Sequence, residues 1–201
     1  MAAFCLAMSV MPSVASCSDQ AADPQPEADH GAGHAEDTPG ASDPGTHQEG
    51  WNDADAAFLE GMIPHHQQAL EMAELARTRA ESPDVLALAE RIAAAQGPEI
   101  LVMADWLVDH GREVPDRAHH EPGALHGMLS DDQMAELAQA DGAAFDELFL
   151  TGMVQHHEGA VEMALVALSD GEDQRVSELA NDVNATQAAE IARMEALLSS
   201  R

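Results

Sequence analysis

The sequence predicts an all-α protein, a four-helix bundle built from two tandem helical hairpins. Ala, Leu and Glu dominate the composition, Tyr is absent, and aromatic residues make up 3% of the chain, which is typical of helical proteins. Apolar residues recur at helical spacing from residue 52 onward. A long segment also occurs twice, 91 positions apart. Two hairpins of long amphipathic helices pack as a four-helix bundle with a pseudo-twofold axis.

The first 16 residues are predicted to be a signal peptide. Residues 2–16 are apolar and small, but a bilayer span needs about 20 such residues, so a signal-peptide hydrophobic region fits better. Val14-Ala15-Ser16-Cys17 resembles a bacterial lipobox, in which Cys17 is the lipidated first residue of the mature protein. No Lys or Arg precedes the apolar run, so the true start lies upstream or the signal is atypical. An ordinary cleaved signal is the alternative.

Residues 17–51 are predicted to be a disordered acidic tether, because they are rich in Pro, Gly, Asp and Glu and contain no Lys or Arg. His30, His34 and His47 in this tether could gather metal loosely, although a solvated linker is the simpler interpretation. The two N-terminal segments together predict an exported protein. It is expected to be lipid-anchored to the outer face of the cytoplasmic membrane or otherwise extracytoplasmic, and to meet the membrane only through that anchor.

The folded domain is expected to span residues 52–201. It divides into hairpin one over 52–110, a linker over 111–142 and hairpin two over 143–199.

Local signals mark the ends of the expected helices. Asn52 or Asp53 can cap the first helix, and Pro83 can start the second after a turn at Ser82. A capping box at 130–133 opens a short helix within the linker, and a second turn falls at 169–171.

The charge balance limits the kinds of partner. The chain has 37 acidic and 8 basic residues, for a net charge of −29, which argues against nucleic acid and anionic membrane surfaces and favours attraction of cations. Cys5 and Cys17 are the only cysteines. The folded domain therefore contains neither a disulfide nor a thiolate metal ligand.

The repeated segment carries a His-His pair in each copy, at 65–66 and 156–157, with methionines before and after it. On a helical wheel His65 faces the core and His66 lies at the edge of the apolar stripe. In the returning helix Gln96 and Glu99 also face the core. Glu99 lies as far from Ser82 as His65 does. An unpaired buried carboxylate costs several kcal/mol. The two residues are therefore expected to meet at one level of hairpin one.

This donor set favours copper over other metals. Imidazole and thioether groups suit Cu(I), and Cu(II) is held by imidazole and carboxylate. Zinc leaves the methionines unexplained, and di-iron sites use four carboxylates with Glu-x-x-His motifs that the second and fourth helices lack. The candidate metal residues are Met62, His65, His66, Met72, Gln96, Glu99, Met103, Met153, His156, His157, Met163, Gln187, Glu190 and Met194.

The motif Phe-x-x-x-Met-Ile-Pro-His-His-x-x-Ala-x-x-Met-Ala, followed by Ala-Gln-x-x-Glu-Ile-x-x-Met, resembles the bacterial family known as domain of unknown function 305. The resemblance covers about residues 52–198, and the segment 127–137 matches as well. It implies an exported, ferritin-like helical protein associated with copper binding and copper resistance, with the fourteen candidate residues at its motif positions. One departure is Gln155, which stands where the first copy has Pro64.

The first functional hypothesis is an extracytoplasmic copper chaperone, buffer or resistance factor whose partners are the metal ion and a copper-handling protein. A metal-dependent oxidoreductase is an alternative, but no proton-transfer group or substrate pocket can be read from the sequence, so an enzyme is not favoured. A third hypothesis is a structural module in which His–Glu pairs form a buried polar network that sets helix register.

Overall fold

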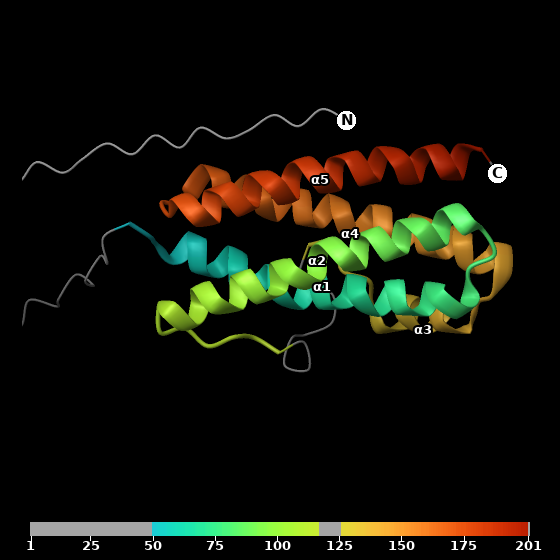
Figure 1. Cartoon of the computed structure of the whole chain (residues 1–201), viewed down its shortest axis with the longest axis horizontal. Helices are drawn as coiled ribbons and strands as arrows, with labels where there is room; N and C mark the ends of the chain where they lie inside the picture. The colour runs from blue at the N-terminus through green and yellow to red at the C-terminus, as the bar shows by residue number, and fades with distance from the viewer. Residues whose placement is uncertain (1–49, 117–125, 201) are drawn as a thin grey trace, which may run out of the picture. The chain divides into compact units, whose positions relative to one another are not determined.

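The computed structural model describes residues 50–116 and 126–200 and confirms the all-α class. The signal peptide, the tether up to residue 49 and the lipidation site Cys17 lie outside the described residues. So do the histidines at 30, 34, 47, 119 and 120. The helices of the described part are α1 (Asp53–Arg79), α2 (Pro83–Asp109), α3 (Asp131–Gln139), α4 (Gly142–Asp170) and α5 (Gln174–Ser199) (Figure 1).

The helices begin at residues that satisfy their free backbone N–H groups. The Asn52 side chain accepts hydrogen bonds from Ala54 and Asp55, and the Asp55 side chain accepts one from the Asn52 backbone. The predicted capping box of α3 is present, with the Ser130 side chain accepting a bond from the Gln133 backbone. Pro83 starts α2, as its fixed φ and missing N–H favour.

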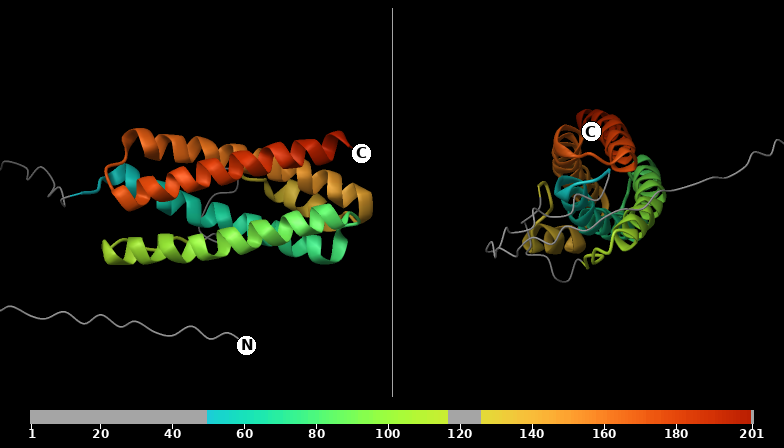
Figure 2. Two further views of the ribbon diagram at one scale, coloured as in Figure 1. Left: turned by 45° about the horizontal axis from the view of Figure 1, so that its top comes forward. Right: turned by 90° about the vertical axis from the view of Figure 1, so that its left-hand side faces the viewer.

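Helices α1 and α4 form the centre of the domain. Helix α1 packs against α2 and α4, and α4 packs against α5, so each hairpin adds its second helix to one side of the central pair (Figure 2). The N-terminal half of α1 shares an apolar cluster with the C-terminal half of α4. The central helices therefore run antiparallel.

The core is divided into two apolar clusters. The Phe58 cluster contains buried apolar residues from within 56–63 of α1, 103–107 of α2, 160–167 of α4 and 176–183 of α5. The Phe149 cluster contains buried residues of α1, α2 and α4 that lie nearer the α1–α2 turn, together with Met194 of α5.

A layer of polar side chains lies between the two clusters on every long helix. We refer to these residues as the polar layer. All of its members except the two partly buried glutamates are fully or almost fully buried. The polar layer consists of His65, His66 and Gln68 on α1, Gln96 and Glu99 on α2, His156 and His157 on α4, and Gln187 and Glu190 on α5.

Two buried aspartates tie the hairpins to each other. Asp146 of α4 accepts hydrogen bonds from the backbone N–H groups of Glu81 and Ser82 at 3.1 and 2.9 Å, in the turn of hairpin one. Asp55 of α1 accepts bonds from the backbone of residues 172 and 173 at 2.9 and 3.1 Å, in the turn of hairpin two. Each turn is thus held by the other hairpin. This pair was not predicted from the sequence.

The second of these contacts depends on a glycine. A Cβ atom at Gly171 would collide with the Asp55 carboxylate and would lie 2.6 Å from the carbonyl oxygen of Ala167. Gly171 therefore lets the Asp55 side chain approach the turn closely.

Within the described ranges, none of the helices combines the length and apolar character that crossing a bilayer requires.

Candidate metal centre

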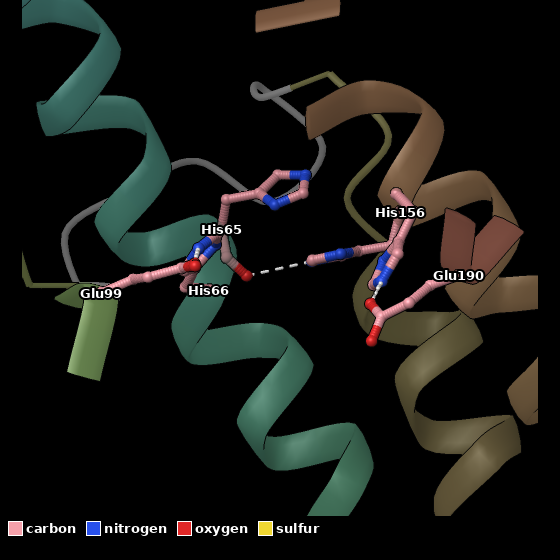
Figure 3. A network of polar contacts seen from close by, with 6 residues as sticks. His65, His66, Glu99, His156 and Glu190 are labelled. Atoms are coloured by element: carbon pink, nitrogen blue, oxygen red, sulfur yellow. Dashed lines mark hydrogen bonds and ion pairs between the residues drawn. The ribbon is translucent and has the colours of Figure 1, made fainter. Parts of the chain in front are cut away.

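His65 and His156 meet at the centre of the domain. Their rings are in contact, with centroids 3.7 Å apart and planes tilted by 38°, and both side chains are fully buried. The Nε2 atom of His156 donates to the backbone oxygen of His65 at 3.0 Å (Figure 3). This contact joins equivalent positions of the two repeats, because the residues are 91 positions apart.

Each second histidine is paired with a glutamate of its own hairpin. Nε2 of His66 lies 2.7 Å from Oε2 of Glu99, and Nε2 of His157 lies 2.7 Å from Oε2 of Glu190. The two glutamate side chains are 23% and 14% exposed. Glu99 and Glu190 lie on opposite sides of the contact between His65 and His156 (Figure 3).

The sequence placed the His-His pair and Glu99 at one level, and the histidine that bonds to Glu99 is His66 rather than His65. His66 contacts Glu99 and is as fully buried as His65. Neighbouring residues of a helix point about 100° apart, so only one of the two can face α2. The other, His65, faces the loop before α3, where its Nε2 atom donates to the carbonyl oxygen of His126 at 3.1 Å.

Two residues of this network were missed by the sequence analysis as site residues. His126 lies in the linker, where no helical periodicity places it beside α1. Gln68 is buried and bonds to the backbone of Leu129. Its position on the buried side of α1 was the one available signal, because a buried amide needs a partner.

The partners of the Nε2 atoms determine the tautomers of the four histidines. A carbonyl oxygen can only accept a hydrogen bond, so the Nε2 atoms of His65 and His156 carry the proton. The carboxylates of Glu99 and Glu190 likewise accept from their histidines. In a neutral ring the lone pair then lies on Nδ1. All four Nδ1 atoms are buried and have no hydrogen-bond partner among the described residues.

Two glutamines of the polar layer also have buried polar atoms that lack a hydrogen-bond partner among the described residues. Gln96 and Gln187 are 3% and 2% exposed, and neither their amide nitrogen nor their amide oxygen has a hydrogen-bond partner in the described part of the chain. An unsatisfied buried polar group costs about 1–3 kcal/mol. Six such side chains in one layer indicate that the layer has a role besides packing.

Burial keeps the rings of His65, His66 and His156 neutral by lowering the pKa of each. Desolvation, followed by the proximity of His66, lowers the pKa of His65 from 6.5 to about 3, and the hydrogen bond to His126 opposes this only in part. Desolvation and then the proximity of His65 lower the pKa of His156 well below its ordinary value. Desolvation also lowers the pKa of His66, against the opposing effect of Glu99. These three rings therefore present lone pairs at neutral pH.

The six methionines of the predicted set lie on both sides of the polar layer. Met62 and Met103 are fully buried in the Phe58 cluster. Met72, Met153 and Met194 are fully buried in the Phe149 cluster. Met163 is half-buried and, with His126, lines a surface groove of about 330 Å³. The thioether groups thus flank the histidines.

Within residues 50–116 and 126–200, no three His, Cys, Asp or Glu side chains converge in an arrangement that would hold one ion. The fit to a metal therefore rests on the chemistry of the donors. Imidazole lone pairs with thioethers on either side form a soft set that suits copper.

This geometry defines the class of protein. It is an all-α domain in which histidines are buried between two methionine-containing clusters. The chain belongs to the DUF305 family, described as a domain of unknown function, whose sequence model matches residues 55–198. No curated protein matches the chain.

Solved structures of the family are similar to this one. A fragment from Deinococcus radiodurans is 29% identical with a TM-score of 0.69, over 75% of this chain and 98% of the other. A DUF305 protein from Streptomyces coelicolor, labelled as secreted, is 30% identical with a TM-score of 0.67, over 73% and 93%. The Cu(II)-bound form of CopM is 35% identical with a TM-score of 0.64, over 73% and 96%. CopM has also been solved with Cu(I) and with silver.

Proposed function

We propose that this protein binds copper outside the cytoplasm, favours Cu(I), and acts as a copper buffer or resistance factor. The observation that carries the proposal is the set of four buried Nδ1 atoms that have no partner in the described part of the chain. These atoms belong to His65, His66, His156 and His157.

The proposed thioether ligands are Met62, Met103, Met153 and Met194. Each is separated from a histidine or glutamate of the polar layer by about one helical turn, and each is fully buried. Met72 and Met163 lie farther from the histidines along their helices. We propose that they contribute less to metal binding at the same site. These methionines would supply the sulfur donors that Cu(I) prefers.

Glu99 and Glu190 are proposed to orient ligands. Each accepts the Nε2–H bond of a histidine, as carboxylates commonly do behind metal-bound imidazoles. Gln96 and Gln187 remain candidate ligands through their unpaired amides.

Copper as the metal is supported by the relatives. CopM, at 33–35% identity, has been solved in Cu(I)-bound and Cu(II)-bound forms. Export is supported by the secreted relative together with the apolar residues 2–16. Lipidation of Cys17, and delivery of copper to or from a copper-handling protein, belong to the same proposal.

Titration of the metal-free full chain with Cu(I) against a chelator tests the proposal. We expect a dissociation constant below micromolar, and binding at least about 100-fold weaker in the double variant His65→Ala/His156→Ala, because two central ligands are lost. His110→Ala is the matched control, since His110 stacks on Trp106 outside the polar layer. Wild-type binding weaker than micromolar, or affinity unchanged in the double variant, would contradict the proposal.

A structural role is the second candidate. It is favoured by the Nε2 atoms, all four of which already have protein partners. It predicts that the melting temperature of metal-free protein stays constant when Cu(I) is added, whereas ligand linkage to a copper site raises it.

A further inference from the structure

The two central histidines are not equivalent, although the sequence around them repeats. His156 donates its Nε2–H to the backbone oxygen of His65. The symmetric counterpart would be a bond from His65 to the backbone oxygen of His156. Nε2 of His65 instead donates to the carbonyl oxygen of His126. The linker thus supplies the acceptor that the backbone of His156 would supply in a symmetric arrangement.

Residues 126–129, which we call the strap, are held by both central helices. The Gln68 side chain of α1 bonds twice to Leu129, donating to its carbonyl oxygen at 2.9 Å and accepting from its N–H at 2.7 Å. The Gln155 side chain of α4 donates to the carbonyl oxygens of Gly127 and Met128 at 3.2 and 3.4 Å. The strap is therefore anchored to both α1 and α4 next to the central histidines.

The two repeats differ at both positions of α4 that contact the strap most closely. Gln155 stands where hairpin one has Pro64, and Gly159 stands where it has Gln68. Two of the differences between α4 and α1 thus fall at contacts of α4 with the strap.

Gly159 makes the closest of these contacts. A Cβ atom at Gly159 would collide with the carbonyl group of His126 and would lie 2.6 Å from the Cα atom of Gly127. Gly127 itself has a φ of 77° and would collide with the backbone of α4 if it carried a Cβ. These neighbours are backbone atoms, which cannot turn aside as a flexible side chain can. A side chain at position 159 must therefore lift His126 away from α4.

We propose that Gly159 is a positioning residue for the copper site, an inference that rests on the proposed function. By admitting the strap, Gly159 places the His126 carbonyl where it accepts Nε2–H of His65. That bond fixes the tautomer in which Nδ1 of His65 carries the lone pair. Without it, the Nε2–H and Nδ1–H forms of His65 both become populated, and the Nδ1–H form cannot ligate through Nδ1.

The test compares Gly159→Ala with Gly97→Ala in the full chain. Gly97 is the matched control, because it lies inside α2 and a Cβ there would meet nothing within 4 Å. In metal-free protein labelled with ¹⁵N-histidine, long-range ¹H–¹⁵N spectra report each tautomer. We expect a single Nε2–H form of His65 in the wild type and in Gly97→Ala, and a mixture in Gly159→Ala. His66 and His157 should keep their forms.

Cu(I) affinity is then measured by chelator competition, with about 10- to 100-fold weaker binding expected in Gly159→Ala, as for other residues that orient metal ligands. A wild-type His65 spectrum in Gly159→Ala, or a changed spectrum with wild-type affinity, would overturn the positioning role alone. Failure of the wild type to bind Cu(I) would overturn the proposed function instead.

Gln155→Ala is the second variant, for the case in which Gly159→Ala does not fold. It removes the two bonds from Gln155 to the strap without inserting an atom against the backbone. The same mixture of His65 tautomers, with a smaller loss of Cu(I) affinity, is expected. A wild-type spectrum and affinity in this variant would count against the strap as the element that orients His65.

Discussion

The metal-free protein is expected to lose about 2 kcal/mol of unfolding free energy through His65 alone when the pH falls from 7 to 5. Burial lowers the pKa of His65 from 6.5 to about 3 in the folded protein. Between these values the unfolded chain binds a proton that the folded protein does not. Stability is therefore highest above pH 6.5 and declines as the pH falls toward 3.

His66 and His156 act in the same direction, because burial lowers the pKa of each below its ordinary value. Most Asp and Glu side chains stay ionised above pH 5, so histidines dominate this window. Urea unfolding at pH 7 and pH 5 measures the effect. The variant His65→Gln/His156→Gln should show a smaller difference than the wild type. Equal stability of the wild type at the two pH values would show that the rings are not buried in neutral form.

Asp146→Ala is expected to destabilise the protein by about 3 kcal/mol. The Asp146 side chain is 2% exposed and accepts two backbone bonds from the turn of hairpin one. Hydrogen bonds to charged groups contribute about 1.5–3 kcal/mol each, and the two turn N–H groups lose their partner. Asp55→Ala should have a similar effect on the turn of hairpin two, because Asp55 makes the equivalent contacts there.

Asp141→Ala is the matched control for these variants. Asp141 precedes α4 and forms an ion pair with Arg79 at 3.1 Å, but its side chain is 73% exposed. Exposed ion pairs contribute up to about 1 kcal/mol. Urea unfolding at pH 7 should therefore show a much larger loss of unfolding free energy for Asp55→Ala and Asp146→Ala than for Asp141→Ala. Similar losses from Asp141→Ala and Asp146→Ala would mean that the buried contact does not tie the hairpins together.

Much of the fold was predictable because its signals are local. The helix-start signals at Asn52, Pro83 and Ser130 each depend on a few neighbouring residues, and the observed helices begin there. Helical periodicity also predicted that polar residues such as Gln96 face the core, and Gln96 is 3% exposed. The contacts of Asp55 and Asp146 were missed, since each joins a helix to a turn far away in the sequence.

The candidate site was predictable in its residue types but only partly in its contacts. Periodicity and equal distance from the turn brought the His-His pair and Glu99 to one level, and the structure pairs His66 with Glu99. Which of the two adjacent histidines faces α2 depends on how α1 is rotated about its axis. Packing of α1 against three other elements sets that rotation, and the pattern within α1 does not specify it.

The sequence by itself determined that this protein is helical, and it predicted that histidine, glutamine and glutamate occupy inward-facing positions in two repeated hairpins. It could do so because helical spacing and repetition are properties of the chain. The tertiary structure alone decided that the ring of His65 contacts that of His156, that the methionines divide between two clusters, and that the strap reaches His65. These contacts depend on the packing of helices and on the course of the linker, which join residues that no local pattern relates.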